Sequence, residues 1–109
     1  MDTNEKRAVL SQSTLFDNLL TTELTMLADL FVAKDYEAGE LVFDEGVVGD
    51  SMYVIESGSV EVLRKNPQGE YQQIAVLGDK KFFGEMSLID KEYRSATVRA
   101  KESARLLQL

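Results

Sequence analysis

Apolar residues in the first third of the chain recur at the spacing of a helix. Positions i, i+3, i+4 and i+7 of one stretch are occupied by Leu24, Leu27, Ala28 and Phe31. This spacing predicts an amphipathic helix whose apolar face is core. Thr21 or Thr22 is the expected N-cap, and Glu23 lies in the first turn, where a carboxylate favours the helix dipole. A shorter helix is predicted before it, over residues 5–10.

From Tyr36 onward the pattern changes to short runs of Val, Ile, Tyr and Phe separated by glycines. The runs lie at 41–43, 52–55, 60–63 and 71–77, with alternation over 96–100 and a last run at 105–109. Regular short strands with glycine turns are typical of a β-sandwich or barrel. The stretch 66–69, Asn-Pro-Gln-Gly, predicts a hairpin turn. The pattern as a whole predicts a mainly β domain preceded by two short helices.

One segment, residues 83–100, interrupts the strand pattern and carries the candidate chemistry. Gly84 and Glu85 stand at a predicted helix start, and Arg94 follows nine residues after the glutamate. A helix start offers unpaired N–H groups to an anion, glycine allows close approach, and arginine supplies charged donors. A carboxylate repels phosphate, so Glu85 needs a partner of its own, such as a pair of ribose hydroxyls. The segment therefore predicts a sugar-phosphate site.

Length and composition set the class of protein. The 109 residues are 44% hydrophobic and 28% charged, as expected of one globular domain that buries its own core. No apolar run approaches the ~20 residues that a membrane helix needs. The first twelve residues contain no long apolar stretch after their basic residues, so no secretory signal is predicted. We therefore expect a cytoplasmic protein that does not enter the membrane.

Charge and two missing residue types exclude several functions. The formal net charge of −7 argues against nucleic acid as a partner, because phosphate backbones are bound by basic faces. The sequence has no cysteine, which excludes disulfides, thiolate zinc sites and iron–sulfur clusters. It has no histidine, which excludes imidazole ligation and histidine-dependent triads. A cupin-type metal enzyme is disfavoured for the same reason. We expect no metal, no cofactor and no catalytic residues.

The chain resembles the cyclic nucleotide-binding domain of bacterial catabolite-type regulators and protein kinase A regulatory subunits. Residues 38–63, glycine-punctuated, are similar to the family's early β-roll. Residues 83–97 match the phosphate-binding cassette: Phe-Gly-Glu, a short helix, then arginine, a small residue, alanine and threonine. The resemblance implies one domain over 1–109, with a helical part at 1–34 and a jelly-roll β-roll (double-stranded β-helix) at 35–109. The family's C-terminal lid helices would follow the last residue of this sequence.

The resemblance also assigns roles to the cassette. It implies that Glu85 binds the ribose 2′-hydroxyl and that Arg94 binds the exocyclic oxygens of the cyclic phosphate. The ligand-binding set that it implies is Gly84, Glu85, Met86, Ser87, Arg94, Ser95 and Ala96. Tyr53, Leu88 and Ile89 are expected to be supporting core. Tyr93 stands where many members have proline, so some pre-ordering of the loop that aims the arginine is lost.

The implied function is a sensor domain that couples cyclic nucleotide binding to an effector outside this chain. Cyclic AMP is the expected ligand on family frequency, with cyclic GMP open because a hydroxyl at Ser95 suits either nucleotide. An effector domain, a protein partner or a homodimer is left open. The alternative is a degenerate β-roll that binds proteins without ligand and uses Glu85 and Arg94 as an internal pair.

Overall fold

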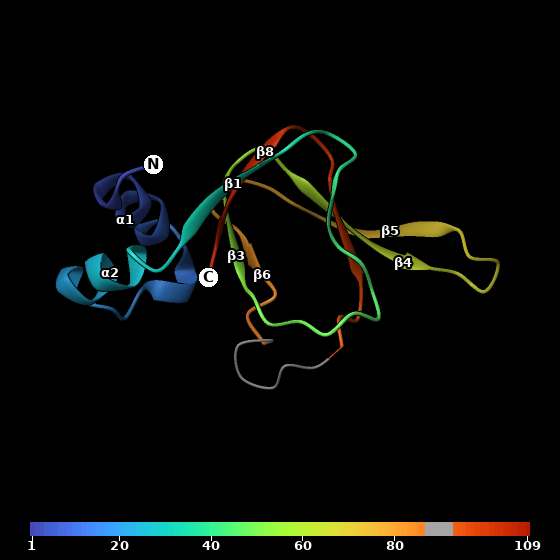
Figure 1. Ribbon diagram of the computed structural model, residues 1–109, viewed down its shortest axis with the longest axis horizontal. Coiled ribbons are helices and arrows are strands. Elements are labelled where there is room, and N and C mark those ends of the chain that lie inside the picture. The colour runs from blue at the N-terminus through green and yellow to red at the C-terminus, as the bar shows by residue number, and fades with distance from the viewer. Residues whose placement is uncertain (87–92) are drawn as a thin grey trace.

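The computed structural model describes residues 1–86 and 93–109, which form helices followed by β-strands (Figure 1). The helical elements are α1 (Thr3–Ser11), a 3-10 turn η1 (Thr14–Phe16) and α2 (Thr21–Ala28). The strands are β1 (Val32–Tyr36), β2 (Leu41–Phe43), β3 (Tyr53–Ser57), β4 (Val60–Lys65), β5 (Tyr71–Leu77), β6 (Phe82–Phe83), β7 (Thr97–Ala100) and β8 (Ala104–Gln108).

The described strands form two four-stranded antiparallel sheets. Their strand orders are β1-β8-β3-β6 and β2-β7-β4-β5. The helices lie at one end of the molecule and the β4–β5 hairpin projects from the opposite end (Figure 1). The mainly β fold with N-terminal helices, predicted from the glycine-punctuated runs, is confirmed. The cassette connects the two sheets, because its first residue lies in β6 of the first sheet and its last residue lies in β7 of the second.

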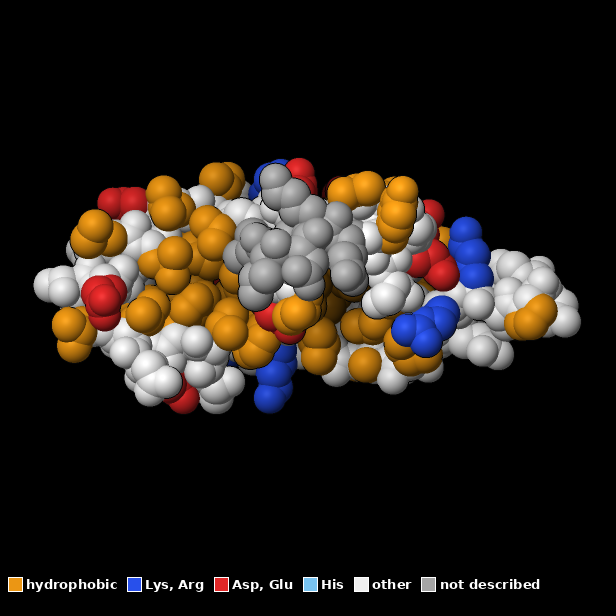
Figure 2. Space-filling view, turned by 90° about the horizontal axis from the view of Figure 1, so that it is seen from below, with side chains coloured by type: hydrophobic (Ala, Val, Ile, Leu, Met, Phe, Trp, Pro, Cys, Tyr) orange, Lys and Arg blue, Asp and Glu red, His pale blue; other side chains and the backbone are white. Residues whose placement is uncertain are grey.

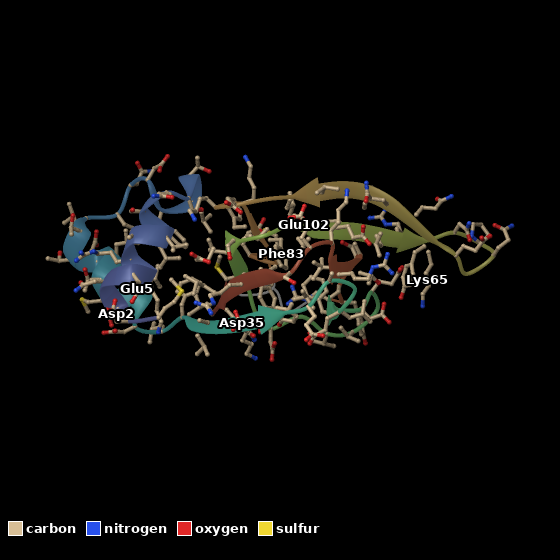
Figure 3. The ribbon with its side chains drawn as sticks, turned by 90° about the horizontal axis from the view of Figure 1, so that it is seen from above. Asp2, Glu5, Asp35, Lys65, Phe83 and Glu102 are labelled. Atoms are coloured by element: carbon tan, nitrogen blue, oxygen red, sulfur yellow. The ribbon has the colours of Figure 1, made fainter. Side chains whose placement is uncertain are left out.

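Among the described residues, α1 and α2 each carry in the first turn a glutamate that accepts a hydrogen bond from the N-cap N–H. At α1, Glu5 accepts from the Asp2 N–H while the Asp2 side chain accepts from the Glu5 N–H, a capping box (Figure 3). At α2 the N-cap is Leu20, whose N–H donates to Glu23 at 2.9 Å. The prediction of a threonine N-cap was wrong, because Glu23 satisfies the exposed donor and Thr21 enters the first turn. Within residues 1–86 and 93–109, no helix combines the length and apolar character that a membrane crossing needs.

β3 is buried on both of its faces. Successive side chains of a strand point to opposite faces. Val54, with Met52 just before the strand, packs against the helices together with Leu107. Tyr53 and Ile55 pack inside the roll. The continuous apolar run at 52–55 thus follows from the position of this strand between two cores.

The helix face predicted around Leu24 is core, as expected, although the helix is shorter than its apolar pattern. α2 ends at Ala28, and a turn carries the chain on to Phe31, which is fully buried in the same cluster as Leu24 and Ala28. The outer surface of this end also carries apolar side chains (Figure 2). Those exposed on or beside α2 include Leu19, Leu20, Met26 and Leu30.

Every predicted strand is present, and the described residues contain two further strands, β1 and β6, that were not predicted. β1 begins four residues before the Tyr36 from which the strand pattern was expected; the adjacent charged residues Lys34 and Asp35 leave it without an alternating apolar pattern. β6 is two residues long. The hairpin turn at 66–69 is confirmed: Gly69 has a φ of +81° and donates to the Asn66 carbonyl.

Gly58 and Gly39 provide a matched test of packing at the end of the roll. Both have positive φ, +86° and +89°, so alanine at either costs about 1–2 kcal/mol of backbone strain. A Cβ on Gly58 would lie 2.2 Å from the Ser103 carbonyl oxygen, whereas one on Gly39 would meet nothing within 4 Å. We expect Gly58→Ala to lower the free energy of unfolding by about 1–3 kcal/mol more than Gly39→Ala. Urea unfolding of both variants checks this; equal losses would contradict it.

Candidate ligand-binding pocket

A pocket of about 390 Å³ opens beside the cassette, between the two sheets. It is lined by Phe43, Val62, Phe83, Gly84, Glu85, Met86, Tyr93, Arg94, Ser95, Ala96 and Val98. Its volume lies within the range of small-molecule sites, roughly 300–1,000 Å³. The lining combines an apolar wall with one carboxylate and one guanidinium. Such a lining suits a ligand that has an apolar part, hydroxyl groups and an anionic group.

Gly84 follows β6, which β3 holds in place through the Tyr53–Phe83 pair. Its φ is +78°, in the region that favours glycine. A Cβ here would lie 2.9 Å from Arg94 Nη1 and 3.0 Å from the Ser51 carbonyl oxygen. The sequence suggested that this glycine makes room for a ligand. In the structure its missing Cβ leaves room for the arginine, and its role toward a ligand stays a prediction.

Arg94 is anchored through its main chain. Its N–H donates to the Val47 carbonyl at 2.7 Å, and its own carbonyl accepts from the Gly46 N–H at 2.8 Å. The neighbouring Tyr93 forms an antiparallel bridge with Val48. These contacts fix the backbone of the arginine against a segment almost fifty residues earlier in the sequence.

The guanidinium of Arg94 is buried beside an aromatic cluster. The residue is 9% exposed, its Nη2 donates to the Ser51 carbonyl at 2.8 Å, and its Cζ lies 4.0 Å from the Phe43 ring centroid. Burial lowers the pKa of Arg94 from its usual value, while Tyr53 and Asp50 act in the opposite direction. Arginine stays charged in proteins, so the pocket contains a fixed cation.

Three aromatic rings cluster beside this cation, and two of them, Phe43 and Phe83, line the pocket. Tyr53 and Phe83 stack with centroids 5.0 Å apart, and Phe43 lies 5.9 Å from each. Burial raises the pKa of Tyr53, so its hydroxyl is neutral at pH 7. Tyr53 is 5% exposed, in agreement with its predicted role as supporting core.

Behind the pocket wall, Thr97 joins β2 to β7. Its hydroxyl donates to Asp44 Oδ1 at 2.5 Å and accepts from the Glu45 N–H at 3.0 Å. Glu45 in turn accepts from the Lys65 N–H on β4. The Thr97 hydrogen bond is the largest cause that lowers the pKa of Asp44, with a nearby Lys65 contributing. Thr97 is fully buried, so this threonine of the cassette supports the site rather than the ligand.

The structure brings most of the predicted site residues to one pocket. Those that line it are Gly84, Glu85, Met86, Arg94, Ser95 and Ala96. Glu85 is half-buried, whereas Met86 and Ser95 are exposed. Ser87, with the predicted cassette helix and the core residues Leu88 and Ile89, lies outside the described residues.

Five further residues line the pocket without having been predicted. They are Phe43, Val62, Phe83, Tyr93 and Val98. Val98 stands two positions after Ala96, which lies just before β7, so the alternation predicted over 96–100 could have indicated it. Val62 is paired with Val98 across β4 and β7, and this register could not be read from the sequence.

The polar groups of the pocket are suited to binding a small polar ligand. Among the residues described, no group of three or more His, Cys, Asp or Glu side chains gathers as a metal site would require. Glu85 and Arg94 offer an acceptor for hydroxyls and donors for an anion, the two groups expected for a sugar phosphate.

Comparison with known proteins shows which family the chain is related to. Residues 33–109 match the model of the cyclic nucleotide-binding domain. The chain is 36% identical over 97 residues to the cyclic AMP receptor protein of Thermus thermophilus, covering 89% of this chain and 45% of that protein. It is 32% identical over 98 residues to a cGMP-dependent protein kinase of Plasmodium berghei, covering 90% of this chain and 11% of the kinase.

A similar structure has also been solved. The N-terminal domain of a transcriptional regulator from Streptomyces coelicolor superposes with a TM-score of 0.86 at 34% identity, covering 93% of this chain and 72% of that one. The chain spans less than half the length of the two curated relatives.

The hydroxyl of Thr97 provides a test of the supporting network. We expect Thr97→Val to cost about 1–3 kcal/mol of unfolding free energy near neutral pH, because a buried side chain loses two part-buried hydrogen bonds. The folded-state pKa of Asp44 lies below 3.8, so its contribution is present above that pH and fades as pH falls below it. The penalty of Thr97→Val should therefore be smaller at about pH 3 than at about pH 7.

Urea unfolding at both pH values measures this difference. Thr22→Val, on the exposed surface of α2, makes the same chemical change without the network and serves as the control. A Thr97→Val penalty that is equal at the two pH values would show that Asp44 is not coupled to the threonine.

Proposed function

The chain belongs to the cyclic nucleotide-binding domain family, and from this premise we propose that its pocket binds cyclic AMP and that binding is coupled to an effector outside the chain. In this proposal the domain acts as a receptor and not as a catalyst. The observation that carries the proposal is the buried guanidinium of Arg94 in the same pocket as Glu85. The proposal places the domain in the cytoplasm, as expected from its sequence, and takes residues 1–109 as one domain.

The proposed roles follow the chemistry of each group. Arg94 donates to the exocyclic oxygens of the cyclic phosphate, and the Ser95 main chain and hydroxyl complete the anion contacts. Glu85 accepts from the ribose 2′-hydroxyl. Gly84, Met86, Ser87 and Ala96 contact the ligand around these groups. The apolar wall that includes Val62 and Val98 faces the remaining, less polar part of the nucleotide.

Cyclic AMP is preferred to cyclic GMP because the bacterial relative with 36% identity is a cyclic AMP receptor. The Plasmodium relative is a cyclic GMP-dependent kinase at slightly lower identity, so both nucleotides belong in the test. Coupling requires that the ligand bind two states of the domain unequally. We propose that the chain beyond β8 responds to binding, since β8 pairs directly with β3, the strand whose Tyr53 pairs with and stacks on the pocket residue Phe83.

Arg94 provides the main test. Calorimetric titration of the wild-type chain with cyclic AMP and cyclic GMP should give saturable binding, tighter for cyclic AMP. We expect Arg94→Gln to weaken cyclic AMP at least tenfold and Arg94→Glu to abolish binding, because a charged hydrogen bond contributes about 1.5–3 kcal/mol. Arg105→Gln is the charge-matched control, since Arg105 pairs with Asp35 on β1, away from the pocket. Absence of heat from wild type at millimolar nucleotide would reject the proposal.

The role proposed for Glu85 can be tested by changing the ligand as well as by changing the residue. We expect Glu85→Gln to weaken cyclic AMP about tenfold, whereas 2′-deoxy cyclic AMP should bind wild type and Glu85→Gln with nearly equal affinity. The reason is that the deoxy ligand lacks the hydroxyl with which Glu85 would interact. Titration of both proteins with both ligands measures the coupling. If the two ligands lose affinity by the same factor, Glu85 does not read the ribose hydroxyl.

A further inference from the structure

A second arginine, Arg64, contacts a residue that lines the pocket. Arg64 lies on β4 two residues after Val62, so it shares the face of the strand that lines the pocket. Its Nε donates to the Ser95 carbonyl at 3.3 Å. Ser95 is itself a lining residue and directly follows Arg94. Arg64 therefore reaches from the β4–β5 hairpin to the cassette.

The guanidinium of Arg64 has N–H donors that the described residues do not use. Within residues 1–86 and 93–109, its only hydrogen bond is the one from Nε, which leaves both Nη groups available. The ion pairs formed inside the same ranges are Arg99 with Glu61 and Arg105 with Asp35, so no described carboxylate neutralises Arg64. The side chain is exposed. Arg64 is therefore an anchored cation without a described counter-ion, in a chain of net charge −7. Its charge can attract an anionic ligand to the pocket.

We propose that Arg64 is a second cation for the phosphate of the bound nucleotide. This inference rests on the proposed function and assigns the site a residue outside the cassette. The hydrogen bond to Ser95 holds the guanidinium beside the phosphate end of the pocket, and its positive charge attracts the anionic ligand. Arg94 binds from the buried side, and Arg64 acts from the solvent side. Because Arg64 is exposed, its effect is screened by salt, unlike that of the buried arginine.

The test is calorimetric titration with cyclic AMP at about 50 mM and about 300 mM salt. Arg64→Met keeps most of the side-chain length without charge or donors, and we expect it to weaken binding about five-fold at low salt, the effect of one exposed charge at contact distance. At the higher salt the loss should fall below about two-fold. Arg64→Lys keeps the charge and should stay within about two-fold of wild type at both salts. Arg105→Met, charge-matched and outside the pocket, should match wild type.

Several outcomes would overturn the inference. It fails if Arg64→Met binds like wild type at low salt, if its loss is equal at both salts, or if Arg64→Lys is as weak as Arg64→Met. Urea unfolding of each variant separates a lost ligand contact from a destabilised fold: a loss of affinity that parallels a loss of stability also counts against it. If wild type binds neither cyclic nucleotide, the proposed function itself fails, a result distinct from any difference among the Arg64 variants.

Discussion

The burial of β3 on both faces is the constraint on which the rest of the structure depends. One face closes the core beneath the helices and the other closes the core of the roll. Neither layer can separate from the strand without exposing large apolar surface to water. The same strand positions the pocket. Ser51, which binds Arg94, lies just before β3, and the pocket residue Phe83 pairs with Tyr53 of β3.

The fold must also compensate the burial of the charged Arg94 side chain. A buried charge is unfavourable unless other groups satisfy it. Arg94 gains a backbone carbonyl from Ser51 and the face of the Phe43 ring, and Gly84 leaves the space that its Nη1 occupies. Ser51 and Phe43 lie more than forty residues before Arg94 in the sequence, whereas Gly84 belongs to the same cassette. The cation can therefore be held in place only when the roll is complete.

The walls around this cation are strands tied together by a small polar network. Thr97 on β7 bonds Asp44 and Glu45 after β2, and Glu45 bonds the main chain at the end of β4. Groups on strands are positioned more rigidly than groups on loops. The arrangement gives the cassette a stiff support on its C-terminal side, and Arg64 extends that support to Ser95 through a hydrogen bond.

The sequence by itself determined the local elements and the types of groups at the site. The helical spacing around Leu24, the glycine-punctuated strands and the turn before Gly69 depend on neighbouring residues, so their patterns are visible in one dimension. The chemical requirement for a donor and an acceptor likewise singled out Arg94 and Glu85. Only the tertiary structure decided which distant residues meet. β1 and β6, the pocket wall at Val62, and the contacts of Arg94 with Ser51 and Phe43 arise from strand pairing and packing between segments that the sequence places far apart.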